Sequence, residues 1–341
     1  IMAGIDYIFL DTSNAYQYEF DTTDPGRFDG TLKSPTYTLL DTMLALYNLG
    51  WDVPKVVFLT NTKSGERVDN IYKYFYQSGK YEELWFKPDG KPMIIGTTEQ
   101  NNGASDTWGT ANFVPISATM QEYFDVKDIQ WPNQADEPNG FPWLSWYYPQ
   151  TYHVETQAIS VSVAQHGASS GNFTGMDPQS NRGYDYRTGT VEEKWQEGKN
   201  FENQWQAVFD NEERGNHVRF VQVTGWNEWI GMKFDNLAEK AVMVDQFYGP
   251  YTRDIEMDKT LYQDDTYLQL VRNIRKFKMN EAADEYDWPE STISSVSDFD
   301  GVEAVYTDFA GDATARDFWS FDVRRGQPRY TDTTNRNDIV E

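Results

Sequence analysis

The feature that most constrains the fold is an alternation of strand-like and helix-like stretches along the chain. The expected strands lie at 5–10, 55–61, 92–96 and 158–167, with a further one that begins near 218. The expected helices lie at 36–50, 68–76, 201–211 and 267–277. Because strands that alternate with helices usually pair in parallel, the sequence predicts an α/β fold with a parallel sheet.

Polar residues recur at the ends of the expected strands, namely Asp11, Asn61, Gln165, His166, Asn227 and Glu228. Side chains gathered at the carboxyl ends of several strands are typical of the active face of a (β/α)8 TIM barrel. A doubly wound nucleotide-binding sheet is the weaker alternative, because no glycine-rich phosphate loop follows the first strand. The expected fold is therefore a TIM barrel.

The character of the chain changes after about residue 279, where acidic and small polar residues replace the helical pattern. We expect a barrel over 1–283, with its N-terminal part missing, and a linker with the start of a β-rich accessory domain over 284–341. Short alternating stretches at 302–306 and 318–323 are the expected strands of that domain. We expect a hairpin and strand at 84–96 and long loops at 97–140 and 169–189. Within the second loop, Arg182 is expected to be solvated, and contact with an acidic or sulfated sugar is the alternative.

The segment from Phe220 to Trp229 combines a strand pattern with a dense polar and aromatic end. Glu228 stands there beside Asn227 and between Trp226 and Trp229. A carboxylate framed by indoles suits a sugar site, as an acid with a raised pKa or as an acceptor for hydroxyl groups. The alternative is a glutamate that caps the turn after a buried strand.

Composition excludes several classes of function. The net charge of -25 and the pI of about 4.4 disfavour nucleic acid and anionic membrane surfaces, which need clustered Lys and Arg. The chain has no cysteine, which excludes disulfides and thiol catalysis, and its 3 histidines are too few for most histidine metal clusters. Aromatic residues make up 16% of the chain, which suits a protein that stacks sugar rings. No apolar run is long enough to span a bilayer, and no cofactor or metal is expected.

Three islands of sequence together resemble glycoside hydrolases of families 71 and 99. They are Gly4–Asp11 with Asn14, Gly225–Trp229, and Asp245–Phe247 followed by Tyr251–Glu256. The resemblance implies a (β/α)8 fold and hydrolysis of α-linked glycans, and it implies a catalytic acid or base at Glu228. It also departs from the pattern of family 99, in which a second glutamate follows the first by three positions, because that position here is Gly231.

The partner acid must then come from another strand. Asp11 is the best placed, followed by Asp245 and, in a long loop, by Asp136 and Glu137. The two carboxyl groups of a glycosidase lie about 5–5.5 Å apart for retention and about 6.5–9.5 Å apart for inversion. The predicted catalytic residues are Glu228 and Asp11. The predicted substrate-binding residues are Asn14, Trp146, Gln150, Gln165, His166, Trp226, Asn227, Trp229 and Asp245.

These observations predict a secreted, periplasmic or cell-surface bacterial glycoside hydrolase with a carbohydrate partner, acting on a polysaccharide or complex glycan. The long aromatic loops favour endo action. Two other classes stay open: a non-catalytic glycan-binding protein on the same barrel, and a metal-dependent hydrolase that uses the surplus of aspartates.

Overall fold

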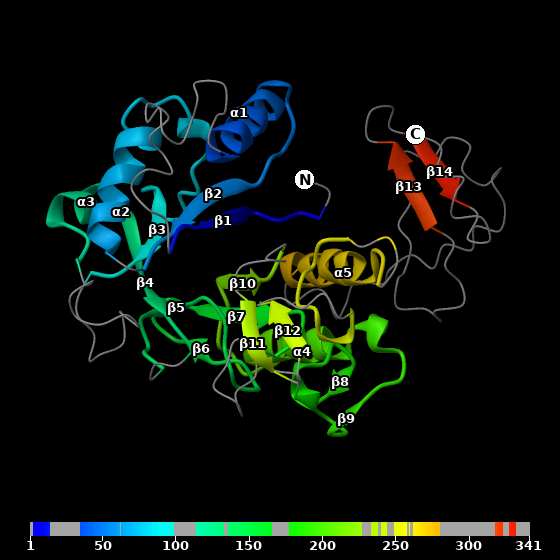
Figure 1. Ribbon diagram of the computed structural model, residues 1–341. Helices are drawn as coiled ribbons and strands as arrows, with labels where there is room; N and C mark the ends of the chain where they lie inside the picture. The colour runs from blue at the N-terminus through cyan, green and yellow to red at the C-terminus, as the bar shows by residue number, and fades with distance from the viewer. Residues whose placement is uncertain are drawn as a thin grey trace. The chain divides into compact units, whose positions relative to one another are not determined.

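The computed structural model describes residues 3–13, 35–61, 63–98, 114–132, 136–165, 177–226, 233–237, 240–243, 249–257, 259, 262–279, 318–322 and 327–331. The chain forms two compact units, Ile1–Arg275 and Lys276–Glu341 (Figure 1). The boundary between them falls inside the last helix of the first unit. All the predicted site residues belong to the first unit.

The first unit is built on a curled sheet of five parallel strands in the order β1-β2-β3-β4-β5 (Figure 1). Its strands are β1 (Tyr7–Asp11), β2 (Lys55–Leu59), β3 (Met93–Gly96), β4 (Asp125–Gln130) and β5 (Gly140–Pro142). A second sheet has the order β10-β7-β6, with β10 (Phe220–Thr224), β7 (Ala158–Ser162) and β6 (Tyr152–His153). Within it β7 and β10 are parallel, whereas β6 is antiparallel to β7.

Side chains from both sheets meet in one apolar cluster, here called the inner core. Its buried members are Val57, Leu59, Met93, Ile95, Ile129, Trp131, Phe141, Trp143, Leu144, Ala158 and Phe220. The ring centroids of Phe141 and Phe220 are 5.6 Å apart. The Tyr7 hydroxyl donates a 2.9 Å hydrogen bond to Gln222 Oε1, so β1 and β10 contact one another across 215 positions of sequence.

The opposite face of the five-stranded sheet is covered by helices, because side chains of a strand alternate between its two faces. On β2, Val57 and Leu59 enter the inner core, whereas Val56 and Phe58 pack in a second cluster with the helices. Phe58 stacks on Phe75 with centroids 5.4 Å apart. The covering helices are α1 (Pro35–Asn48) and α2 (Ser64–Ile71), which continues as a π-helix over Tyr72–Tyr76.

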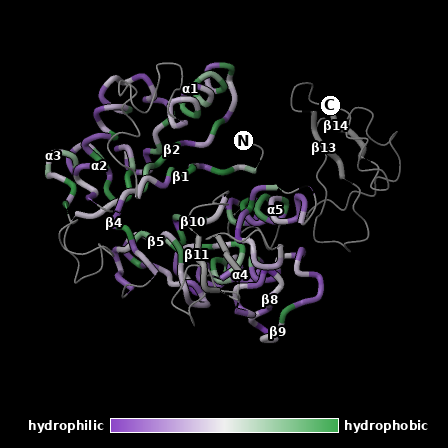
Figure 2. The backbone as a smooth tube through the Cα atoms, in the orientation of Figure 1, coloured by the Kyte–Doolittle hydropathy of each residue, from purple (hydrophilic) through white to green (hydrophobic). Residues whose placement is uncertain are grey.

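The other helices are α3 (Ala118–Tyr123), α4 (Lys199–Glu213) and α5 (Asp265–Met279). Hydrophobic and hydrophilic residues alternate around α5 (Figure 2), and its buried apolar residues within the first unit are Leu270, Val271 and Ile274. Short 3-10 helices lie at Glu82–Leu84, Pro178–Ser180, Trp195–Glu197 and Gly249–Tyr251. Two small antiparallel pairs join β8 (Tyr184–Asp185) to β9 (Thr190–Val191) and β11 (Lys233–Leu237) to β12 (Lys240–Met243).

The predicted α/β class and the parallel sheet are confirmed. The described strands form a curled parallel sheet beside a smaller one, which is a coarser result than the predicted complete (β/α)8 barrel. The hairpin expected at 84–96 is wrong, because β3 pairs in parallel with β2 and Trp85 forms an isolated parallel bridge with Val56. The long loop expected at 97–140 is wrong in part, since it contains α3, β4 and the start of β5.

The second unit shows one antiparallel pair, β13 (Phe318–Asp322) with β14 (Gln327–Thr331). β13 confirms the strand expected at 318–323. The strand expected at 302–306 lies outside the described residues, and the β-rich accessory domain over 284–341 stays a prediction. None of the described helices is both long and apolar enough to cross a membrane.

Candidate functional site

The carboxyl ends of β1 to β5 lie at one edge of the sheet, since all five strands are parallel. The ends of β7 and β10 are tied to the same edge by two hydrogen bonds. Thr224 Oγ1, at the end of β10, donates to the carbonyl of Trp143, and Gln165 Nε2, beyond β7, donates to the carbonyl of Ser145. Trp143 and Ser145 directly follow β5. Seven strand ends therefore converge on one region.

At this edge, one residue at or just beyond the end of each strand of the large sheet lies on the side of the sheet that carries the inner core. We call this set the strand-end layer: Asp11, Asn61, Thr97, Trp131 and Trp143. Each lies two positions beyond a side chain that packs in the inner core, so the period of two places it on the same face. Trp131 and Trp143 confirm this, because both pack in the inner core with their ring centroids 4.6 Å apart.

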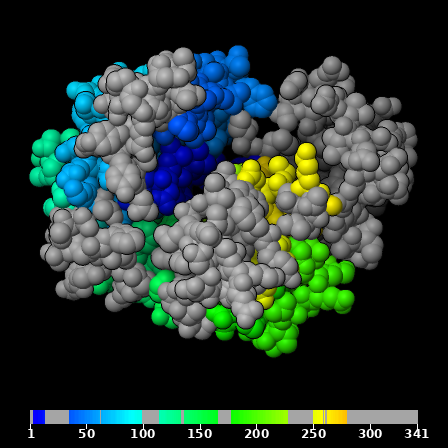
Figure 3. Space-filling view, in the orientation of Figure 1, coloured from blue at the N-terminus to red at the C-terminus, as the bar shows by residue number. Residues whose placement is uncertain are grey.

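Asp11 is the predicted catalytic residue that the structure describes. It ends β1 on the face that also carries Tyr7 and Phe9, and it is exposed to solvent. Part of the segment 3–13, dark blue in Figure 3, is visible on the face of the molecule shown there. Desolvation by the surrounding protein nevertheless raises the pKa of its carboxyl group, and hydrogen bonds from Ser13 oppose that shift. Ser13 N–H donates to Asp11 Oδ1 over 2.8 Å.

Two predicted binding residues, Gln150 and Gln165, are brought together. Gln150 Nε2 donates to Gln165 Oε1 over 3.0 Å, and Gln165 Nε2 donates to the Ser145 carbonyl. Both glutamines are almost fully buried, at 4% and 1% exposure. Gln150 Oε1 is buried and has no hydrogen-bond partner among the residues that the structure describes. Buried amides are costly unless they are paired, so this oxygen needs an explanation beyond packing.

The two predicted sugar-stacking tryptophans that the structure describes, Trp226 and Trp146, differ in solvent exposure. Trp226 is 44% exposed and meets the Tyr267 ring edge-on, with centroids 6.2 Å apart. Its indole is therefore available to stack on a ligand. Trp146 is partly buried and packs against the inner core, so at least part of its surface serves the fold.

Sequence reasoning missed Thr97, Trp131 and Trp143 of the strand-end layer, and it placed Asn61 at the expected active face without naming it as a binding residue. Asn61 Oδ1 and Thr97 Oγ1 are buried and lack a hydrogen-bond partner within the described part of the chain. The signal that could have found them is a count of two positions from the last apolar inward residue of each strand. This count requires knowing which side chains of each strand face the inner core, and the sequence alone does not give that.

The backbone that follows β10 is fixed by a close approach to the segment Thr252–Glu256. Ile255 N–H donates to the Gly225 carbonyl over 3.0 Å, and Glu256 N–H donates to the Trp226 carbonyl over 2.9 Å. Gly225 has φ +89°, and a Cβ atom there would lie 2.5 Å from the Arg253 carbonyl oxygen. Glycine is therefore required at the start of the Gly225–Trp229 motif.

Arg182 donates hydrogen bonds to that segment, and the prediction that its side chain is solvated is wrong. Its side chain is fully buried, with the guanidinium 3.7 Å from the centre of the Tyr262 ring. It donates to the carbonyls of Thr252 (3.5 Å) and Asp254 (3.3 Å) and to Thr266 Oγ1. Burial lowers the pKa of Arg182 to about 10, which leaves the group charged at neutral pH. The Arg182 side chain therefore has a structural role, since it connects the loop before β8 to the segment Thr252–Glu256 and to α5.

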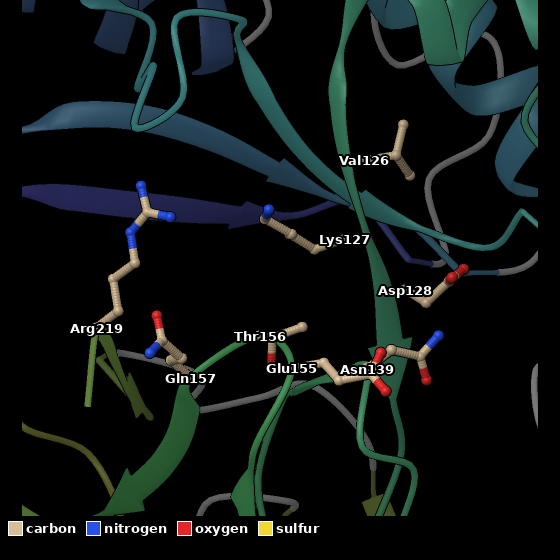
Figure 4. A pocket seen from close by; sticks show the side chains of 8 residues that line it. All are labelled: Val126, Lys127, Asp128, Asn139, Glu155, Thr156, Gln157 and Arg219. Carbon is tan, nitrogen blue, oxygen red and sulfur yellow. The ribbon is translucent and has the colours of Figure 1, made fainter. Parts of the chain in front are cut away.

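A polar cavity of about 280 Å³ lies away from the strand-end layer, beside the amino ends of β5, β7 and β10 (Figure 4). Its lining residues are Val126, Lys127, Asp128, Asn139, Glu155, Thr156, Gln157 and Arg219. Its two cations are held by carboxylates: Lys127 Nζ lies 2.9 Å from Asp125, and Arg219 lies 2.8 Å from Asp89. The hydrogen bonds from Arg219 lower the pKa of Asp89. These ion pairs explain the cavity as part of the polar packing at the amino ends of the strands.

The structure does not describe the other predicted site residues. Asn14, His166, Asn227, Glu228, Trp229 and Asp245 lie outside the described residues. Of the lower-ranked acids, Asp136 is exposed and accepts a 2.9 Å hydrogen bond from Thr151. Among the residues that the structure describes, no group of three or more His, Asp or Glu side chains is arranged to hold a metal ion.

Comparisons of the chain with models of known protein families, with curated proteins and with solved structures returned no match.

Proposed function

We propose that the chain is a glycoside hydrolase that cleaves a polysaccharide or complex glycan with Glu228 and Asp11 as its two carboxyl groups. The observation that carries the proposal is Asp11, an accessible carboxyl in the strand-end layer whose pKa is raised by desolvation. Glycosidases need one carboxyl that holds a proton near neutral pH and another that is ionised. Asp11 has the environment of the first kind.

The proposal includes a complete (β/α)8 barrel. Seven strand ends meet at one edge, and the segment Thr252–Glu256, which runs beside Gly225 and Trp226, would supply the eighth strand. α5 follows that segment, as a helix follows each strand in such a barrel. Ile274 of α5 lies against Gly4, just before β1, with 3.6 Å between its Cγ2 atom and an added Cβ at Gly4. This contact supports a last helix adjacent to the first strand.

In the proposed mechanism Asp11 protonates the glycosidic oxygen of the leaving group. Ser13 N–H is bonded to Asp11 Oδ1, which leaves Oδ2 to carry the proton. Glu228, four positions after the end of β10 in the sequence, would act from the opposite side of the sugar as nucleophile or as the base that activates water. Activity should therefore fall as the pH rises through the pKa of Asp11, because the group loses the proton that it must donate.

The neighbouring residues suit a sugar. The half-exposed indole of Trp226 offers a flat apolar surface to a pyranose ring. Asn61 and Thr97 extend the polar part of the layer on the side of β2 and β3. The aromatic segments at 97–140 and 169–189 are the sequence ground for proposing endo action on a long chain.

A non-catalytic glycan-binding protein is the second candidate, and one observation favours it. The position that holds the second glutamate in the family 99 pattern is Gly231 here. If Asp11 does not replace that acid, the same surface would bind a glycan without cleaving it. A metal-dependent hydrolase is the third candidate, and loss of activity in EDTA would distinguish it.

The test is release of reducing ends from a panel of α-linked bacterial, fungal and plant polysaccharides. The proposal expects turnover of at least one member, unchanged by EDTA, and a loss of about 100-fold or more in kcat for Asp11→Asn and Glu228→Gln. Asp52→Asn, an exposed acid before β2, is the matched control and should keep wild-type activity. Release of no reducing ends from any member would refute the hydrolase.

A further inference from the structure

The polar cavity beside the amino ends of β5, β7 and β10 has walls that ion pairs hold in place (Figure 4). Lys127 Nζ lies 2.9 Å from Asp125 and 3.9 Å from Asp89. Arg219 bonds both carboxylate oxygens of Asp89, over 3.1 and 2.8 Å. Neither aspartate is among the lining residues, so both hold the two cations from outside the cavity. The interior of about 280 Å³ stays open and, since ligand pockets begin at about 300 Å³, it suits a small molecule.

Solvent reaches this cavity at a place where β4 extends past its neighbour. β5 begins at Gly140, which pairs with Asp128, and this register leaves the first half of β4 without a β5 residue opposite it. Three of the lining residues are exposed at the surface: Asn139, Glu155 and Arg219. A dissolved molecule can therefore enter the cavity from solvent.

Opposite charges line different sides of the cavity (Figure 4). Lys127 and Arg219 lie on one side, on the left of the view. Asp128 and Glu155 lie on the other, where both are hydrogen-bonded through their backbones to the segment 138–140. The charges of the lining therefore sum to zero, but the two signs are separated.

Both sides have hydrogen-bonding capacity that the protein does not use. The ammonium group of Lys127 and the guanidinium group of Arg219 carry more donors than their bonds to the aspartates occupy. On the acidic side, Asp128 accepts hydrogen bonds of 3.0 Å from the backbone and the hydroxyl group of Thr98, which are neutral donors. Within the described part of the chain, no cation lies within ion-pair distance of Asp128 or of the exposed Glu155.

We propose that this cavity binds a small zwitterion of the amino-acid class, with its carboxylate at Lys127 and Arg219 and its ammonium group at Asp128 and Glu155. Such a ligand matches both sides with charge-assisted hydrogen bonds, whereas a ligand with a single charge satisfies one side only. A sugar fits less well, because the described lining residues include no aromatic ring. The site goes beyond the proposed function, since none of its residues belongs to the strand-end layer.

The test measures binding of five compounds to the full chain by isothermal titration calorimetry: alanine, propionate, ethylammonium, lactamide and glucose. Propionate lacks the ammonium group of alanine, ethylammonium lacks its carboxylate, and lactamide has a similar size without either charge. Glucose represents a neutral sugar. We expect alanine to bind at least tenfold more tightly than each of the others, a change of about 1.4 kcal/mol that one charge-assisted hydrogen bond can supply.

Two variants separate the two sides of the site. Glu155→Gln keeps the size of an exposed side chain, and it should weaken binding of alanine about tenfold without weakening binding of propionate. Arg219→Gln should weaken binding of alanine and propionate but not of ethylammonium. Glu193→Gln, at an exposed glutamate outside the lining, is the matched control and should bind as wild type. General damage to the fold would not produce this charge-specific pattern, and circular dichroism verifies folding.

Absence of alanine binding by the wild-type chain would overturn the proposal. Binding of glucose or lactamide as tight as that of alanine would overturn it as well, because the cavity would then take a neutral ligand. So would wild-type affinity for alanine in a folded Glu155→Gln chain. The comparison of compounds on the wild-type chain stands even if a variant fails to fold. None of these results bears on the hydrolase, which is tested separately by release of reducing ends.

Discussion

Arg182 offers the sharpest test of how the region after β10 is held in place. The substitution Arg182→Met keeps an unbranched apolar side chain but removes the guanidinium. The carbonyls of Thr252 and Asp254 and the hydroxyl of Thr266 then lose their buried donor. The stacking on Tyr262, at 3.7 Å, is lost as well.

The expected cost follows from these contacts. Each buried acceptor left without a donor costs about 1 kcal/mol or more, and a desolvated cation–π contact contributes about 1–2 kcal/mol. Relief of the burial that lowers the pKa of Arg182 to about 10 offsets part of this. We expect a net loss of about 3 kcal/mol in the free energy of unfolding, or roughly 6–12 °C in Tm for a unit of this size.

The assay is thermal unfolding followed by circular dichroism, with urea unfolding as a second measure. Arg187→Met is the comparison variant, since Arg187 is 63% exposed, although the Asp185 side chain that it bonds is 4% exposed, and it should cost about 1 kcal/mol. Arg182→Lys should fall between Arg182→Met and wild type, because an ammonium group replaces part of the charge but not the planar fork. If Arg182→Met is as stable as Arg187→Met, the contacts of Arg182 with Thr252, Asp254 and Thr266 do not stabilise the region after β10.

Two further predictions concern stability. Gly225→Ala should lower the free energy of unfolding in urea by about 2–4 kcal/mol, because the added Cβ would lie 2.5 Å from the Arg253 carbonyl oxygen. The control Gly215→Ala, also at positive φ but with open space around it, should lower it by about 1 kcal/mol. Equal losses for the two variants would contradict this prediction. The hydrogen bonds from Arg187 lower the pKa of Asp185 to about 2, so its contribution of about 1 kcal/mol is present above pH 4 and lost as the pH falls toward 2. Asp185→Asn should flatten that part of the stability–pH curve, and an unchanged curve would count against it.

Much of the fold could be predicted because apolar strands and amphipathic helices carry strong periodic signals. β2 and β7 are runs of buried apolar and small residues, and α4 has its apolar residues on one face. β4 was missed because it carries Asp125, Lys127 and Asp128, which look like a loop. In the structure Lys127 pairs with Asp125 at 2.9 Å, so charges that seem exposed in sequence satisfy one another within the sheet.

The candidate site was predictable in part for a similar reason. Asp11, Gln150 and Gln165 stand near strand ends, and a polar residue after an apolar strand is visible in sequence. The layer that unites Asp11 with Asn61 and Thr97 could not be predicted, because it depends on which face of each strand turns inward. The burial of Arg182 could not be predicted either, since its partners lie 70 to 84 positions away.

The central claim is that Asp11 and Glu228 act together on one glycosidic bond. Its most direct test is the pH dependence of kcat/KM on a polysaccharide that the wild-type chain hydrolyses, compared with Asp11→Asn. The account predicts an activity that declines as the pH rises through the raised pKa of Asp11, and a variant with about 100-fold lower activity that lacks this decline. An Asp11→Asn variant with wild-type activity and the same decline would contradict the account, because another group would then hold the proton.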